Sequence, residues 1–188
     1  MYVVGMNPYQ GLYTKAERNQ GKGATPGTRA SIVAPTGETK EFVAVKLSAA
    51  TWISGIAIIV DGLSASGVGA AAATASGSPA AAINARLGIL VFGSATATQT
   101  MAGTAFGWAQ IYGSVRAWVS ASVSNVGNQL AIGASGQLIL AVSTASDSAQ
   151  TIGISWAQAT NTASSTTGLY TVMLMYPHFS GLPDTNLA

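Results

Sequence analysis

The sequence contains no cysteine and very little charge. Without cysteine, its 188 residues can form neither a disulfide nor a thiolate metal site. Charged residues make up only 7% of the chain, against about 25% in an ordinary globular protein. A surface that attracts water so weakly suits burial against other protein chains better than exposure on an isolated monomer.

Catalytic groups are also scarce, and no pattern of them indicates an enzyme. His178 is the single histidine, and it would need two or three carboxylates beside it to build a zinc site. The carboxylates are scattered singly along the chain, at Glu17, Glu38, Glu41, Asp61, Asp147 and Asp184. Glycine-rich segments lack the Lys-Ser or Lys-Thr of a phosphate loop, and no serine lies in a nucleophile elbow. We therefore predict no enzyme, with no catalytic residue, metal or cofactor. We expect His178 to be an ordinary surface or interface residue, and Glu38 and Glu41 to be solvated charges at a hairpin edge.

The distribution of charge argues against nucleic acid and membranes as partners. The net charge is only +2, and most basic residues precede position 47, so the rest of the chain lacks a basic patch. The best apolar run, residues 52–63, is about half the ~20 residues that cross a bilayer. The first 20 residues also lack the basic and apolar regions of a signal peptide.

Short strand-like segments recur along the chain, separated by Gly, Ser, Asn and Asp. They cover residues 31–49, 53–60, 85–95, 105–123, 125–143, 150–160 and 168–177. No helical periodicity persists for more than a turn or two, so the pattern predicts an all-β fold, a compact antiparallel β-sandwich or barrel. We expect Pro177 to end the last strand because proline has no amide donor.

Two segments do not read as regular strands. Residues 1–30 carry two prolines, five glycines and poor apolar periodicity, which predicts an extended N-terminal arm; a disordered terminus is the alternative. Residues 62–85 are rich in alanine but are interrupted by glycine and proline, which favours a low-complexity loop. The organisation expected is thus an arm over 1–30 and one β domain over 31–188.

The stretch FGWAQIYG at 106–113 alternates large and small side chains. In a simple strand, Phe106, Trp108, Gln110 and Tyr112 point to one side, and the small residues and Ile111 to the other. Such a strand can pack on both faces, and we expect one face to fill the protomer core and the other to lie against a neighbouring subunit. Gly113-Ser114 makes it a bent strand or a hairpin. The aromatic residues predicted to lie in the core or at a subunit interface are Phe106, Trp108, Tyr112, Trp118 and Trp156.

Three pieces of the sequence together resemble the head decoration, or cement, proteins of tailed bacteriophages. They are the strand Leu87–Val91, the aromatic-Gly-Trp-x-Gln-x-x-Gly segment at 106–113, and the closing Met175-Tyr176-Pro177. The resemblance covers roughly residues 42 to 177. The charged N-terminal segment departs from the usual short members of that family.

The resemblance implies a structural virion protein on the outer capsid surface, made in the cytoplasm of a host bacterium. Such proteins assemble as homotrimers at local three-fold axes and bridge neighbouring subunits of the major capsid protein. We expect the neutral body to form the trimer and the N-terminal arm to hold the capsid. The candidate capsid contacts are Tyr2, Tyr9, Tyr13, Lys15, Arg18 and Lys22.

Two other function classes remain open at this point. One is a different structural subunit, such as a phage tail or fibre protein, although long fibres usually show repeats and this chain has none. The other is a carbohydrate-binding module that uses the tryptophans.

Overall fold

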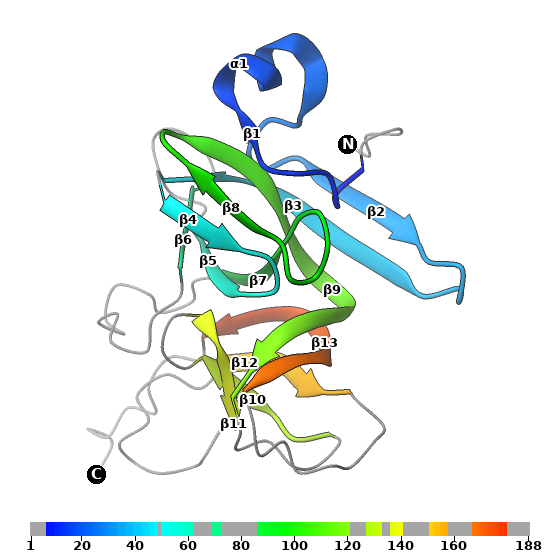
Figure 1. Cartoon of the computed structure of the whole chain (residues 1–188). Helices are drawn as coiled ribbons and strands as arrows, with labels where there is room; N and C mark the ends of the chain where they lie inside the picture. The colour runs from blue at the N-terminus through cyan, green and yellow to red at the C-terminus, as the bar shows by residue number, and fades with distance from the viewer. Residues whose placement is uncertain are drawn as a thin grey trace, which may run out of the picture.

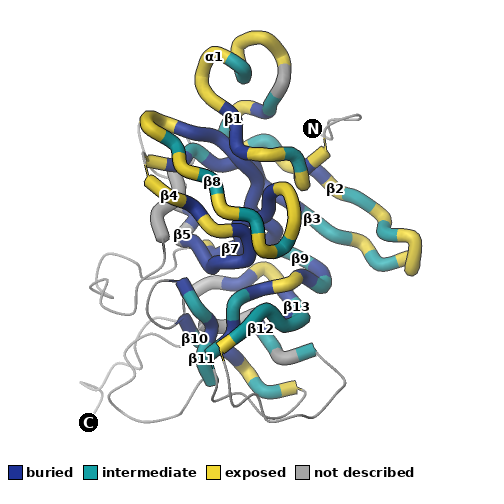
Figure 2. The backbone as a smooth tube through the Cα atoms, viewed as in Figure 1, coloured by how far each residue is buried: buried dark blue, intermediate teal, exposed yellow. Residues whose placement is uncertain are grey.

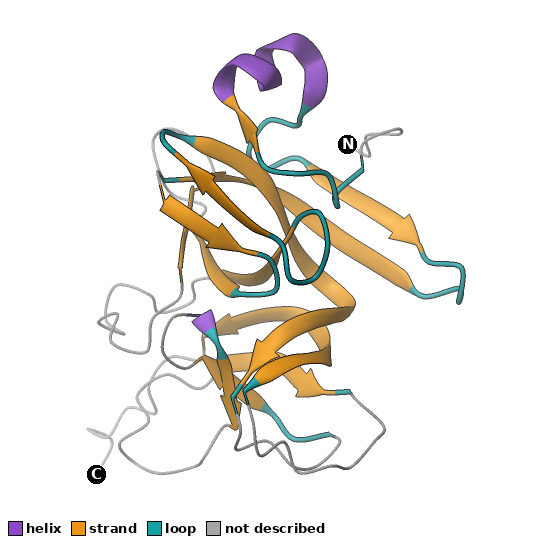
Figure 3. Ribbon diagram, viewed as in Figure 1, coloured by secondary structure: helices purple, strands orange, loops and turns teal. Residues whose placement is uncertain are grey.

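The computed structural model describes residues 7–48, 50–61, 69–72, 86–120, 127–132, 136–140, 151–157 and 167–179. These residues form an almost entirely β structure, and nearly all of its helical residues lie in one loop near the N-terminus (Figure 1, Figure 3). The helical part consists of α1 (Lys15–Glu17) and a kinked helical turn at Arg18–Lys22. The strands are β1 (Tyr13–Thr14), β2 (Arg29–Val33), β3 (Thr39–Leu47), β4 (Ala50–Ile53), β5 (Ala57–Asp61), β6 (Gly69–Ala72), β7 (Arg86–Val91), β8 (Thr98–Met101), β9 (Ala105–Val119), β10 (Leu130–Ile132), β11 (Leu138–Leu140), β12 (Thr151–Trp156) and β13 (Gly168–Phe179).

Most strands belong to one 11-stranded sheet, and β4 and β8 form a separate ribbon. Pairing is antiparallel except for β3 with β6 and β11 with β9. The main sheet ends in two edge strands, β10 and β2, so the structure has open sheets rather than a closed barrel. The all-β prediction is confirmed, in its sandwich-like form.

Strand β9 is the centre of the fold because it changes partners along its length. Its first half pairs with β3 and β7, and its second half, from Tyr112 onward, pairs with β13. Figure 1 shows β9 passing from the region of β1–β8 into the region of β10–β13. A strand that bends and switches partners in this way forms a corner between two packed sheets.

A β-bulge in β9 produces the corner. Phe42 pairs with Gln110 but the adjacent Glu41 pairs with Tyr112, so Ile111 is an extra residue on β9. The bulge moves Tyr112 to the face opposite Gln110. The simple alternation expected over 106–113 is therefore wrong at Tyr112, because an inserted residue reverses the facing of every later side chain.

The two faces of β9 lie in two apolar clusters, and Figure 2 shows this strand as buried along most of its length. Trp108 belongs to the first cluster with Phe42, and Ala109 and Ile111 belong to the second. Beyond the bulge the pattern reverses, since Val115 joins the first cluster and Trp118 packs against the second. Both faces of β9 are thus packed inside one chain, which corrects the expectation that one of them lies against a neighbouring subunit.

Three further sequence expectations need correction. Gly69–Ala72, within the loop expected over 62–85, forms β6 between β5 and β3; the remainder of that loop lies outside the described residues. The segment 98–101, which lies outside every strand-like segment that the sequence pattern predicts, forms β8. Pro177 does not end the last strand: β13 continues to Phe179, and His178 pairs with Ile152 and Arg86. The proline is tolerated because β13 leaves β9 at Met175, where the pairing changes.

Candidate functional site

The buried Gln110 holds the bend of β9 from inside. Its Nε2 donates hydrogen bonds to the carbonyl oxygens of Tyr112, at 3.0 Å, and Ser114, at 2.9 Å. These carbonyls flank Gly113, whose φ of 88° lies in the left-handed region that favours glycine. One amide thus fixes both sides of the turn, which explains the Gln-x-x-Gly spacing of the motif.

Gly107 allows the N-terminal segment to approach β9. A Cβ at this position would lie 2.6 Å from Leu12 Cδ2, so a larger residue here would force the leucine side chain to shift. The Gln99 side chain accepts from Leu12 N at 2.9 Å and donates to Leu12 O at 3.0 Å, as a neighbouring strand would. Leu12 is consequently buried against the body.

Around the outside of the bend lies a group of polar and aromatic side chains that we call the bend cluster: Glu38, Glu41, Tyr112, Ser114 and Tyr176. The rings of Tyr112 and Tyr176 stack with centroids 5.1 Å apart, and Tyr176 Oη donates to Glu41 Oε1 at 2.9 Å. Tyr176 has a φ of 49°, in the left-handed region that few bulky residues adopt, and its side chain is 48% exposed. Strain of this kind persists only where the surroundings enforce it, and here a ring contact and a hydrogen bond do so.

Glu38 ties the turn between β2 and β3 to the bend. Its carboxylate accepts hydrogen bonds from Ser114 N and from Ser114 Oγ, the latter at 2.6 Å. Burial alone would raise the pKa of Glu38, but the two Ser114 bonds and nearby Lys40 outweigh it and lower the pKa. In Tyr176, the hydrogen bond to Glu41 and partial desolvation raise the pKa of the phenol. The expectation of Glu38 and Glu41 as solvated edge charges is therefore corrected, since both carboxylates accept bonds from distant strands.

The Glu38 contact predicts a pH-dependent part of the stability. A pKa lowered on folding stabilises the protein above the ordinary value of 4.5, and this contribution is lost as the pH falls through the folded pKa. Glu38→Gln should therefore lower the melting temperature at pH 7, and the difference from the wild type should shrink near pH 3. Thermal melts at both pH values measure this.

Ser114→Ala provides the matched variant for that prediction, because it removes the Oγ donor and leaves the carboxylate. It should show the same narrowing at acid pH, to a smaller degree. A Glu38→Gln difference that stays constant from pH 7 to pH 3 would contradict the assigned role of the Glu38 carboxylate.

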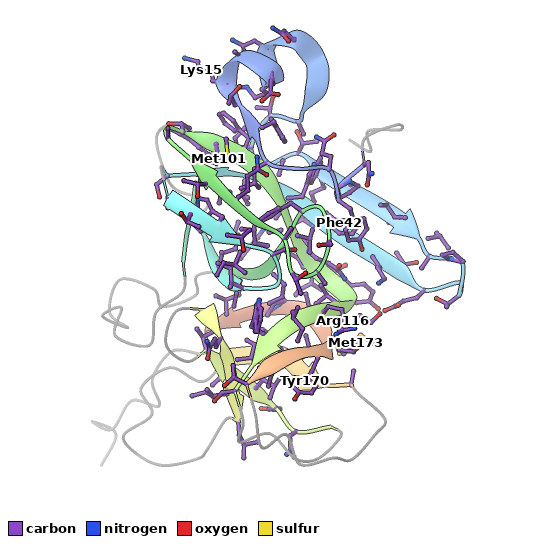
Figure 4. The ribbon with its side chains drawn as sticks, viewed as in Figure 1. Lys15, Phe42, Met101, Arg116, Tyr170 and Met173 are labelled. Atoms are coloured by element: carbon purple, nitrogen blue, oxygen red, sulfur yellow. The ribbon has the colours of Figure 1, made fainter. Side chains whose placement is uncertain are left out.

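The structure places the six candidate contacts of the N-terminal segment very differently from one another. Tyr9 is partly exposed, and its ring meets the ring of Phe42 edge-on, with the two centroids 5.5 Å apart. Burial and the nearby charge of Glu38 raise the pKa of the Tyr9 phenol. Lys15 is exposed on α1, at the outer side of the helical loop (Figure 4). The guanidinium of Arg18 lies 4.5 Å above the ring of Phe106. Tyr2 and the side chain of Lys22 lie outside the described part of the chain.

Tyr13 is the clear correction in this group, because its side chain is only 4% exposed. Its ring stacks on Phe106, and its hydroxyl donates to Ala24 O at 3.1 Å and accepts from Ala24 N at 3.0 Å. Burial accordingly raises the pKa of Tyr13, although the Ala24 bond and Arg18 oppose the shift. A ring enclosed by its own chain is unavailable to a partner, so Tyr13 anchors the base of the helical loop instead of docking on a capsid.

The aromatic core candidates also divide. Phe106 and Trp108 are buried within the chain. Trp118 is partly buried, and its Nε1 donates to Ser54 O at 3.1 Å. Tyr112 belongs to the bend cluster. The backbone of Trp156 pairs with Val172. The side chains of Trp156 and His178 lie outside the part of the chain that the structure describes.

No protein-family model matches the sequence, and no curated protein matches it either. In the residues that the structure describes, no helix is long and apolar enough to cross a membrane. Over the same residues, no three His, Asp or Glu side chains are grouped so that they could hold a metal ion.

Proposed function

We propose that the chain is a structural virion protein of a tailed bacteriophage. In this proposal it is not an enzyme, it binds the outer surface of the head as a homotrimer at local three-fold axes, and it bridges subunits of the major capsid protein. The observation that supports it is the role of the motif at 106–113. Gly107, Trp108, Gln110 and Gly113 each have a packing or bending task in β9. The resemblance to head decoration proteins thus rests on residues that define a fold.

The proposed capsid contact is the helical loop, residues 14–23. The loop stands out from the sheets in Figure 3 and is held at its base by Tyr13. Thr14 and Glu17 form a capping box that fixes its first turn, with Glu17 N donating to Thr14 Oγ1 at 3.3 Å. Each backbone group that the capping box and the Tyr13 bonds already hold need not be ordered on binding, which favours the use of this loop as a contact.

Imaging tests the location, and a mass measurement tests the assembly. Native mass spectrometry of the purified protein should give a trimer. Electron cryo-microscopy of phage particles that carry the protein should then place its density over the local three-fold axes of the head. Density on the tail would favour the tail or fibre subunit instead. A monomer that binds a glycan array and no particle would favour the carbohydrate-binding module.

Charge reversal in the helical loop tests the contact itself. Lys15→Glu should weaken binding to heads that lack the protein by about tenfold, because one attractive contact per subunit becomes repulsive. Removal of residues 1–30 is unsuitable for this purpose, since it also removes the buried Leu12 and Tyr13. A pelleting assay of heads with labelled protein gives the affinity.

Arg86→Glu is the matched control, because Arg86 is an exposed cation on β7 in a different part of the molecule. It changes the net charge equally and should leave head binding close to that of the wild type. If both reversals weaken binding equally, the effect comes from overall charge and the helical loop is not the contact.

A further inference from the structure

Among the residues that the structure describes, β2 pairs on one side only, with β3, so its other edge is open. Ala34 N donates to Glu38 O and Ala44 N donates to Thr28 O, each at 2.8 Å, so the even-numbered residues between them bond to β3. In an antiparallel ladder the alternate residues direct both backbone groups the other way. The outward residues are Arg29, Ser31 and Val33, and all three are exposed. Figure 1 shows β2 along the margin of the hairpin that it forms with β3.

This edge lacks most features that prevent strand pairing. Natural edge strands are usually interrupted by proline, lysine or a bulge. Strand β2 reads RASIV, its register with β3 is unbroken, and its only charge is Arg29 at the first position. Val33, at the other end, is 67% exposed. The occupant that fits such an edge is another extended backbone.

We propose that β2 pairs antiparallel with β2 of a second copy of this chain, about a two-fold axis through Ser31. This register places Ser31 opposite Ser31, and Arg29 opposite Val33 of the second copy. All three outward residues of each copy then take part, for about six backbone hydrogen bonds in all. A register centred on residue 32 would instead oppose Arg29 to Pro35, which has no N–H, and one centred on residue 29 would oppose two arginines.

The edge is therefore complementary to itself. No like charges face each other in the Ser31 register, and the aliphatic stem of Arg29 can cover the exposed Val33 of the other copy. The result is a continuous four-stranded ribbon, β3–β2–β2–β3. A symmetric contact of this kind is the commonest way in which copies of one chain associate.

This contact goes beyond the proposed function, because it uses a two-fold axis and not the three-fold axis of the trimer. It would join a subunit of one trimer to a subunit of the next. On a shell surface, neighbouring three-fold positions are related by two-fold axes, so both contacts can exist together. The β2 contact can also be absent while the trimer forms, and the trimer can be absent while the β2 contact forms.

Single cysteines provide the first test, since the natural chain has none to interfere. Residues opposite each other in a bonded antiparallel pair have Cα atoms about 5.5 Å apart, within the range of a disulfide. Under mild oxidation Ser31→Cys should form a covalent dimer in high yield. Thr36→Cys, in the exposed turn of the same hairpin, should form much less. Equal yields from both variants, or no dimer from Ser31→Cys, would overturn the pairing.

A second test uses the uncrosslinked protein. Ser31→Lys places two ammonium groups opposite each other and should weaken the β2 contact by about tenfold, as seen by sedimentation equilibrium over a range of concentrations. Thr36→Lys adds the same charge away from the edge and should leave association unchanged. Ser31→Pro should also abolish the contact without unfolding the hairpin, because the N–H that it removes points outward.

The outcomes separate the two proposals. Trimers that bind heads but form no Ser31→Cys dimer would leave the proposed function standing and remove the β2 pairing. A Ser31→Cys dimer from a protein that forms no trimer and binds no head would leave the β2 pairing standing and remove the proposed function. Association of the wild type that Ser31→Lys and Thr36→Lys weaken equally would also count against β2.

Discussion

Trp108→Ala should lower the free energy of unfolding by about 3–5 kcal/mol. Trp108 is 0% exposed and packs in the cluster that contains Phe42 and the residues of the second half of β9. Its removal leaves a cavity where β9 meets β3 and β7, so the surrounding strands can collapse only partly. Chemical denaturation followed by circular dichroism, at one protein concentration, measures the loss.

Trp108→Phe is the matched control. The Nε1–H of Trp108 is buried without a hydrogen-bond partner in the described part of the chain, and an unmet donor costs about 1–3 kcal/mol. Phenylalanine removes that donor while it keeps most of the ring, so the loss should be much smaller than for alanine. An unchanged stability of Trp108→Ala would show that the side chain is not buried in solution.

The general class of the fold was predictable because strand signals are local. Alternating and β-branched residues, with turn residues between them, indicate strands wherever they pair. The bulge at Ile111 was not predictable in this way, because nothing in AQIYG marks one residue as unpaired. It depends on the register in which Glu41 and Phe42 meet β9, and that register is set by contacts far apart in the sequence.

The burial of Leu12 and Tyr13 in the N-terminal segment was not predictable either, for the same reason. Leu12 and Tyr13 stand among polar and glycine residues, which hides them as core residues. Their partners lie elsewhere: Gln99, 87 residues away, bonds Leu12, and Phe106 stacks on Tyr13. The one available sequence signal was a glycine that makes room for each buried side chain. A Cβ at Gly23 would lie 2.0 Å from the ring of Tyr13, and Gly107 makes room for Leu12.

Some residues of the bend cluster are predictable from the sequence alone, and others are not. The motif identifies Tyr112 as a core or interface candidate. The dipeptide Gly113-Ser114 predicts a bend in the strand. Glu38 and Glu41 lie more than 70 positions earlier, so their bonds to Ser114 and to Tyr176 required the pairing of β3 with β9. Turn residues and edge charges look alike in a sequence, and only the fold distinguishes a solvated carboxylate from one that joins two strands.

Gly113→Ala should be the most damaging single change outside the core, with a loss of about 2–5 kcal/mol. A left-handed backbone costs a non-glycine residue about 1–2 kcal/mol, and Gly113 has a φ of 88°. The added Cβ would also lie 2.7 Å from the backbone oxygen of Thr39, and forced overpacking costs about 1–3 kcal/mol more. Because the atom in the way belongs to the backbone of β3, the two strands must separate at the bend. Denaturation of the purified variant measures the loss.

Gly37→Ala separates these two contributions within the same hairpin. Gly37 has a similar φ of 83°, but no atom lies within 4 Å of the Cβ that alanine would add. Only the backbone strain applies there, so the loss should stay near about 1–2 kcal/mol. The difference between the two variants therefore measures how closely β3 is held against the bend of β9. Equal losses would mean that β3 yields freely at this point, and that the Glu38–Ser114 contact does not fix the hairpin on the bend.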